Sequence, residues 1–218
     1  MADTIRIVWV NIIVYLIVTV LDISDVFVLS SDILSDIRHP WVLITYMFTQ
    51  VNIVHLCVNM LWLYLFGTYL SNLKLKNQIW YIYISGGITA GLIYLVCNIA
   101  LDKQDMSNLI GASGSVMAVV LSTAVLVPNA KINLLMGKIK LKWFGVLTVI
   151  LFTLGLSGSN YCSHIAHIGG AIAGLLYGCF LKRIHFTDCN ADQEKLIEKI
   201  KISGFSSLSE NEKTNLSG

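Results

Sequence analysis

Residues 143–181 read WFGVLTVILFTLGLSGSNYCSHIAHIGGAIAGLLYGCFL and contain no Asp, Glu, Lys or Arg. Three other windows, 39–73, 77–101 and 106–130, also lack all four charged residue types. Each window is long enough for a transmembrane helix, which needs about 20 apolar residues to cross about 30 Å of hydrocarbon. The sequence therefore predicts an all-α polytopic membrane protein.

The composition of the whole chain supports this prediction. Of its 218 residues, 56% are hydrophobic and 13% are charged, whereas about a quarter of the residues of a soluble domain are charged. A net charge of +2 is too small to indicate nucleic-acid binding, and the lysines are not clustered with aromatic residues. The apolar run 7–21 lacks a cleavage-site pattern, so we expect the first helix to be retained. The five cysteines have no spacing typical of a metal or redox site.

Six transmembrane helices are expected from the hydropathy pattern. Their approximate bounds are 7–27, 53–71, 79–101, 112–127, 143–157 and 165–181. Residues 1–183 are predicted to form the membrane domain, and 184–218 a short helical cytoplasmic tail, because the composition becomes polar after Arg183.

Lys and Arg in the short flanks and loops are divided unequally between the two sides of the predicted bundle. Nine lie on the side of the termini, namely Arg6, Lys74, Lys76, Lys131, Lys138, Lys140, Lys142, Lys182 and Arg183. Only Arg38 and Lys103 lie on the other side. Because cytoplasmic loops are enriched in Lys and Arg, we expect a multi-pass protein of the cell membrane with both termini in the cytoplasm. The aromatic residues and methionine of segment 41–48 favour a loop partly embedded in the membrane interface.

Polar side chains inside a membrane are expensive unless they have partners, so they are candidates for function. Four stand out in the predicted spans: His55, Asn59, Ser113 and His167. His55 and Asn59 are four residues apart and share one helix face. An imidazole and a neutral amide are suitable donors to an oxyanion. Taken alone, however, a hydrogen bond between packed helices explains these two residues better.

Ser113 lies in the stretch LIGASGS, residues 109–115, at the expected start of a short helix. A helix from about residue 112 to the residue before Pro128 is about 24 Å long, which is shorter than the hydrocarbon core. Its N-terminus is therefore expected below the membrane surface, beside a watery cavity. Gly111 and Gly114 allow other main chain to approach, and the free N–H groups of a helix start attract negative charge. By itself the G-x-S-G pattern is more typical of ordinary helix packing.

His167 precedes a ridge of small residues on the last predicted span. Gly170, Gly174 and Gly178 recur every four residues and allow a second helix to pack closely. The helix that begins near Ser113 has a matching small face, at Gly111, Ser115, Ala118 and Ser122. We therefore expect Ser113 and His167 to meet near the non-cytoplasmic end.

Together these residues supply a nucleophile, a general base and oxyanion donors, the set that acyl transfer requires. Neither charge-free window around Ser113 and His167 contains a carboxylate, so the sequence predicts a Ser–His dyad and not a triad. A zinc site built from His55, His164 and His167 is a competing interpretation, since three histidines can hold zinc. It leaves the glycine-flanked Ser113 unexplained.

The chain resembles the rhomboid family of intramembrane serine proteases over about Pro40–Gly178. The resemblance rests on several motifs in the family's order: Pro40-Trp41 through Met47-Phe48, His55-x-x-x-Asn59-Met60 with Phe66-Gly67, Gly111-Ala112-Ser113-Gly114 and Ala166-His167-Ile168-Gly169-Gly170. It implies that Ser113 is the nucleophile and that His167 is the general base and then the general acid. It also implies that His55, Asn59 and the backbone N–H of Ser113 stabilise the oxyanion.

The family fold implied is a bundle of six transmembrane helices around an aqueous cavity, gated by the fifth helix and loop 157–163. The implied substrates are transmembrane proteins in the lipid bilayer, and neither a cofactor nor a metal is implied. Two departures are visible: Met117 occupies a position where many members have an aromatic residue against the histidine, and the Trp-Arg pair of some first loops is not evident. The alternative is a non-catalytic rhomboid-like protein that binds transmembrane clients, although such relatives usually lack the serine or the histidine.

Overall fold

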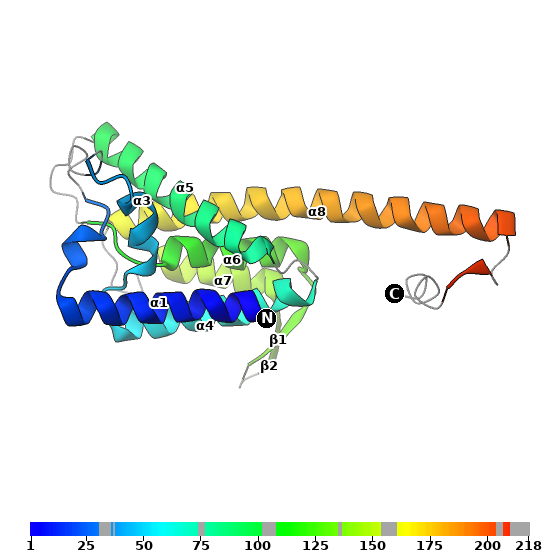
Figure 1. Ribbon diagram of the computed structural model, residues 1–218, viewed down its shortest axis with the longest axis horizontal. Helices are drawn as coiled ribbons and strands as arrows, with labels where there is room; N and C mark the ends of the chain where they lie inside the picture. The colour runs from blue at the N-terminus through cyan, green and yellow to red at the C-terminus, as the bar shows by residue number, and fades with distance from the viewer. Residues whose placement is uncertain are drawn as a thin grey trace. The chain divides into compact units, whose positions relative to one another are not determined.

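Six apolar helices occupy the described residues of the predicted spans (Figure 1). Their bounds are α1 Ala2–Leu21, α4 Ile53–Asn72, α5 Gln78–Leu101, α6 Ser113–Leu126, α7 Leu141–Thr153 and α8 Tyr161–Ser203. In α1, α4, α5 and the first half of α8 the apolar stretch is long enough to cross a membrane, whereas α6 and α7 are shorter. The prediction of a helical, multi-pass membrane protein is confirmed in this form, with four candidate spans.

This computed structural model describes residues 1–30, 36, 38–73, 77–101, 108–134, 137–153, 161–203 and 207–209. The chain divides into two compact units, Met1–Gly178 and Cys179–Gly218, and α8 begins in the first and continues into the second. All residues predicted to carry chemistry belong to the first unit. The predicted end of the fifth helix, 154–157, and positions 157–160 of the predicted gate loop lie outside the described residues.

Two helix ends differ from the prediction for identifiable reasons. The first helix ends at Leu21 and not near residue 27, because Asp22 adopts a left-handed conformation with φ 53° and its N–H closes the helix on Val18. The last helix does not end near residue 181 but continues to Ser203. No glycine or proline lies between Cys179 and Ser203 to stop it, so the predicted domain boundary at 183 and 184 is not a helix end.

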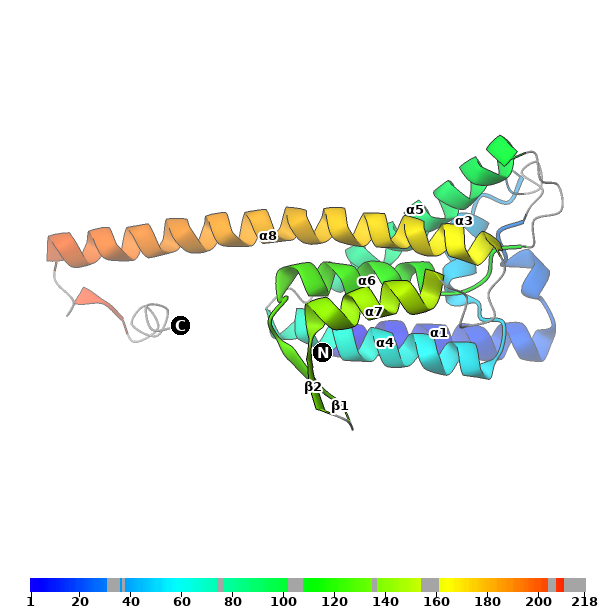
Figure 2. The same ribbon diagram turned by 180° about the vertical axis from the view of Figure 1, so that it is seen from behind.

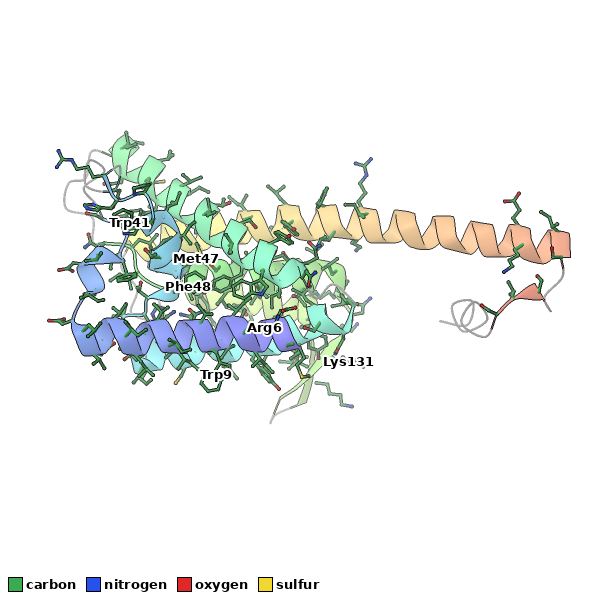
Figure 3. The ribbon with its side chains drawn as sticks, viewed as in Figure 1. Arg6, Trp9, Trp41, Met47, Phe48 and Lys131 are labelled. Atoms are coloured by element: carbon green, nitrogen blue, oxygen red, sulfur yellow. The ribbon has the colours of Figure 1, made fainter. Side chains whose placement is uncertain are left out.

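A β-hairpin that was not predicted connects α6 to α7. Strands β1 (Lys131–Leu134) and β2 (Gly137–Lys140) pair antiparallel, with Lys131 opposite Lys140. The hydroxyl of Tyr69, near the end of α4, donates to the Lys131 carbonyl at 2.8 Å. Arg6 and Lys131 lie toward one end of the helical unit and Trp41 toward the other (Figure 3).

The described part of the segment between α1 and α4 includes the short helical turns η1 (Ser24–Val26), α3 (Val42–Thr45) and η2 (Tyr46–Phe48). Of its apolar residues, Trp41 is 46% exposed. Tyr46 and Met47 are instead buried inside the protein, and the Tyr46 hydroxyl donates to the Gly87 carbonyl of α5 at 2.7 Å. These two side chains therefore face the protein interior, and the position of the loop in the membrane interface stays a prediction.

Helix α6 is the centre of the helical unit. It packs against α4, α5 and α7, and seen from either side it lies between α5 and α4 (Figures 1 and 2). Every residue from Ser113 to Ala124 is buried. A helix surrounded in this way is apolar on all faces, which explains why its sequence has no amphipathic pattern.

The predicted glycine ridge of α8 packs directly on the main chain of α6. Gly170 contacts Gly114, and a Cβ atom added at Gly174 would lie 2.5 Å from the Ala118 carbonyl oxygen and 2.7 Å from its Cα atom. The Ser122 hydroxyl donates to the Gly174 carbonyl at 2.8 Å. The close approach of α6 and α8 therefore depends on glycine at these positions.

Replacing Gly174 with valine is expected to lower the free energy of unfolding by about 1–3 kcal/mol, because the added methyl groups meet α6 main chain that cannot move aside. The measurement is thermal or denaturant unfolding of the protein in detergent micelles. Ile172→Val, on the exposed side of the same helix, is the control and should change little. Equal stability of Gly174→Val and the wild type would contradict the close approach.

Candidate active site

Ser113 and His167 are directly hydrogen-bonded, as their spacing predicts. The Ser113 Oγ atom lies 2.8 Å from the His167 Nε2 atom, although the two residues are 54 positions apart in the chain. Ser113 is the first residue of α6, and His167 lies two turns into α8. Both side chains are buried, with 7% and 2% of their surface exposed. The glycine contacts between α6 and α8 hold these two helix starts together.

The second ring nitrogen of His167 is bound by main chain. Its Nδ1 atom lies 2.9 Å from the carbonyl oxygen of Phe152 in α7. Because a carbonyl oxygen only accepts hydrogen bonds, Nδ1 carries the proton. The lone pair of Nε2 therefore faces Ser113 and accepts a hydrogen bond from its hydroxyl group. This is the tautomer that a general base needs.

The Phe152 carbonyl lies close to two histidines. Phe152 is the second-last described residue of α7. His164 directs its Nδ1 atom to the same oxygen at 3.3 Å. Two imidazole nitrogens thus lie within hydrogen-bond distance of one carbonyl oxygen.

The ring of Phe152 also contacts His167. The two rings meet edge to face, with centroids 5.2 Å apart and an angle of 80°. Phe152 packs in one cluster with Met117 and Leu121 of α6. The departure at Met117 is therefore accompanied by an aromatic contact from a different helix, because Phe152 of α7 lies against the histidine.

The chain enters α6 as extended main chain that is held on both sides. Leu109 pairs with Leu29 through N–O contacts of 2.8 and 3.1 Å, and the Gly111 N–H donates to the Tyr46 carbonyl at 3.1 Å. Gly111 has φ 125°, a conformation that favours glycine, and a Cβ atom here would lie 2.6 Å from the His55 ring. The His55 imidazole therefore lies against the main chain two residues before Ser113.

Helix α6 has 14 residues, so it is about 21 Å long and shorter than the hydrocarbon core of a bilayer, which is about 30 Å. A start that lies below the membrane surface is compatible with its surroundings, because the main chain before it is hydrogen-bonded to protein. The first N–H groups of α6, including that of Ser113, have no intrahelical acceptor.

His55 and Asn59 share one face of α4, as predicted, but they have different surroundings. The Asn52 side chain caps the helix by accepting the His55 backbone N–H at 2.9 Å. The Asn59 side chain is fully buried and donates its Nδ2 proton to Gln50 at 2.9 Å, not to Ser113 or His167. Two buried atoms, His55 Nδ1 and Asn59 Oδ1, have no hydrogen-bond partner.

The competing zinc interpretation requires three ligands in one place. Within the described ranges, no group of three or more His, Cys, Asp or Glu side chains is arranged to hold a metal ion. His164 and His167 both direct Nδ1 at the Phe152 carbonyl, and the His167 Nε2 atom faces Ser113.

Two partners of the site were not predicted from the sequence. The Phe152 carbonyl belongs to the main chain, so no residue type could indicate it. Gln50 lies three residues before α4. It is a polar residue next to a predicted span, which is the signal that could have made it a candidate. The buried contact between Gln50 and Asn59 depends on how the loop folds back on α4.

A model of the rhomboid domain matches residues 38–184 of the chain. This chain belongs to the rhomboid family. The match covers Ser113, His167, His55 and Asn59, and it leaves α1 outside.

Curated relatives are also rhomboid proteins. The chain is 28% identical over 134 residues to the presenilin-associated rhomboid-like protein A, mitochondrial, of Danio rerio, which covers 60% of this chain and 34% of that protein. It is 26% identical over 144 residues to the presenilin-associated rhomboid-like protein, mitochondrial, of Rattus norvegicus, and this match covers 60% of this chain and 35% of that protein. It is 27% identical over 139 residues to rhomboid protein 1, mitochondrial, of Saccharomyces cerevisiae, and this match covers 62% of this chain and 40% of that protein. The match therefore spans about a third to two fifths of the length of these relatives.

Phe152→Leu keeps the main-chain carbonyl and most of the apolar volume but removes the edge-to-face contact with His167. Such contacts contribute about 0.5–1.5 kcal/mol, so the rate at which a fluorophosphonate labels Ser113 is expected to fall roughly two- to tenfold. Phe144→Leu is a matched control on the same helix, because its ring stacks on Phe66 at 5.6 Å. Equal rates in the two variants would contradict a special role of the Phe152 ring.

Proposed function

We propose that this rhomboid-family chain is an intramembrane serine endopeptidase that hydrolyses transmembrane protein substrates with a Ser113–His167 dyad. The observation that carries the proposal is the 2.8 Å contact between Ser113 Oγ and His167 Nε2. The other ring nitrogen of His167, Nδ1, is hydrogen-bonded to the Phe152 carbonyl. A nucleophile within hydrogen-bond reach of a base that is itself oriented by a third group is the arrangement used for acyl transfer.

In the first step Ser113 Oγ attacks the carbonyl carbon of the scissile peptide bond while its proton passes to His167 Nε2. The imidazolium that forms is stabilised by its Nδ1–H bond to the Phe152 carbonyl of α7. His167 then gives the proton to the leaving amide nitrogen, and the C–N bond breaks to leave an acyl-enzyme on Ser113. A water molecule, deprotonated by His167, hydrolyses this ester and restores the serine.

The oxyanion formed in each step needs donors that do not bring a full charge into the membrane. The Ser113 backbone N–H is free because it lies at the start of α6. His55, which lies against Gly111, and Asn59, on the same face of α4, are the proposed side-chain donors. Neutral donors in a low-dielectric site stabilise a developing charge strongly and cost little to bury.

The substrate class follows from the depth of the site. We propose that all six apolar helices cross or enter the bilayer as one bundle, with Ser113 below the membrane surface beside an aqueous cavity. Helix α7 and the loop predicted at 157–163 are the proposed entrance for a substrate helix. Exposed apolar side chains on α7, such as Trp143 and Val146, are suited to contact lipid or such a helix.

The membrane and its sidedness form a separate proposal. The three relatives are named as mitochondrial proteins. Their names do not support the location in the cell membrane that the sequence led us to expect. Charge asymmetry assigns a side and not a compartment. We propose that the N-terminus and the β1–β2 hairpin, with Arg6 and Lys131, share the side that is richer in Lys and Arg, and that 1–183 acts as the membrane domain and 184–218 as its tail.

Ser113→Ala and His167→Ala are each expected to reduce turnover by a factor of about a thousand or more, because residues of such a unit act together. The measurement is cleavage of a fluorescent single-span protein in liposomes, with fluorophosphonate labelling in parallel. Ser122→Ala and His39→Ala are the controls, since Ser122 bonds Gly174 and His39 packs on Trp41. Unchanged labelling in the Ser113→Ala protein would refute the assignment. Recovery of an intact bound client with no cleavage by the wild type would favour the non-catalytic alternative.

Asn59→Ala tests the oxyanion role separately from the dyad. Loss of one such donor typically lowers kcat by about a hundredfold or more, and KM should stay the same because the oxyanion exists only in the transition state and the intermediate. The control is Asn98→Ala, which removes a buried amide side chain from a different helix, α5. Normal turnover in the Asn59→Ala protein would mean that Asn59 has a packing role only.

A further inference from the structure

Three buried amide side chains form a hydrogen-bonded row that ends at Asn59. Asn11 of α1 and Asn59 of α4 are fully buried, and Gln50 between them is 8% exposed. The Gln50 Nε2 atom donates to Asn11 Oδ1 at 3.3 Å, and Asn59 Nδ2 donates to Gln50 Oε1 at 2.9 Å. We call Asn11, Gln50 and Asn59 the amide row.

The direction of the amide row is set by one main-chain carbonyl. Asn11 Nδ2 donates to the Ile7 carbonyl at 2.9 Å, and because a carbonyl cannot donate, the nitrogen of Asn11 must face it. The Asn11 oxygen then faces Gln50, which must present its nitrogen and turn its own oxygen toward Asn59. Asn59 must in turn present its nitrogen. A flipped amide at any position would place two acceptors against each other.

A tyrosine from α5 holds the start of the row. The Tyr83 hydroxyl donates to the Met47 carbonyl at 2.9 Å and accepts from Asn11 Nδ2 at 3.1 Å. Both N–H bonds of Asn11 are thus used, which leaves only its oxygen for Gln50. The row is fixed by main chain of α1 and of the segment before α4, and a rotation of one amide would break several hydrogen bonds in a buried place.

The orientation of Asn59 matters because only one end of an amide can bind an oxyanion. Within the row, Asn59 uses one of its two Nδ2 protons on Gln50, and the second proton remains on the same nitrogen. Its oxygen is buried without a partner. An unrestrained amide that turned its oxygen to the oxyanion would repel the charge and donate nothing.

We propose that Gln50, anchored by Asn11, is a positioning residue that keeps the nitrogen of Asn59, and not its oxygen, available to the oxyanion. This inference rests on the proposed function. It gives α1 a part in the reaction, although α1 lies outside the residues that match the rhomboid domain. Gln50 and Asn11 touch neither Ser113 nor the scissile bond, and they act through Asn59.

The test is a double-mutant cycle between Gln50→Met and Asn59→Ala, measured as kcat and KM for the single-span substrate in liposomes. Gln50→Met removes both hydrogen bonds and keeps the side-chain length, so kcat should fall by about ten- to a hundredfold with KM unchanged. In the Asn59→Ala background the same change should have almost no effect, because the residue through which it acts is gone.

Gln78→Met is the matched control, since Gln78 accepts a hydrogen bond from Tyr177 elsewhere in the unit; it should leave kcat within about twofold of the wild type. If Gln50→Met does not fold, as judged by thermal unfolding, Asn11→Ala takes its place in the cycle with the same expectation. Equal loss of kcat in the wild-type and Asn59→Ala backgrounds would overturn the inference and leave the proposed function intact. Absence of Ser113-dependent cleavage by the wild type would overturn both.

Discussion

The close approach of α8 to α6 is the constraint on which the site depends. Because Gly170 and Gly174 have no side chains, the main chains of the two helices come into contact along Gly114 and Ala118. Only at this separation can the short side chain of Ser113 reach the imidazole of His167 at 2.8 Å. In hydrocarbon, where apolar side chains gain little by leaving lipid, such close packing is itself a main source of helix association. The same contacts therefore hold the helices together and set the geometry of the Ser113–His167 pair.

In the proposed mechanism, main-chain carbonyl groups take the part that carboxylates play in many soluble enzymes. The Phe152 carbonyl selects the tautomer of His167, and the Ile7 carbonyl sets the direction of the amide row. A carboxylate in either place would have to be buried with its charge, which is costly in a membrane. A carbonyl carries no net charge, so both orienting groups suit an apolar environment.

Most of the helical arrangement and the Ser113–His167 pair could be predicted from the sequence. The charge-free windows mark the spans because charge is excluded from hydrocarbon, and the spacing of the glycines identifies the face that carries His167. The hairpin 131–140 was missed because its strands are short and lie between two apolar helices. The burial of Tyr46 and Met47 was missed because an apolar loop can face lipid or protein with the same composition.

The contacts of Phe152 and Gln50 could not be predicted for a different reason. Every residue has a main-chain carbonyl, so no residue type marks the one at Phe152 that His167 contacts. The Gln50 amide finds Asn59 because the segment before α4 folds back on the helix, and Asn11 joins them from a helix far away in sequence. Each of these contacts is a property of tertiary structure and not of a local pattern.

The bond between His167 and Phe152 has a genetic consequence. A triad carboxylate can be lost through a single nucleotide change, for example from an aspartate codon to an asparagine codon. The acceptor at position 152 is part of the polypeptide backbone, and every codon for that position encodes it. A substitution at position 152 can weaken the packing of the ring, but it cannot remove the oxygen that orients His167. The proposed dyad thus exposes fewer essential side chains to mutation than a triad does.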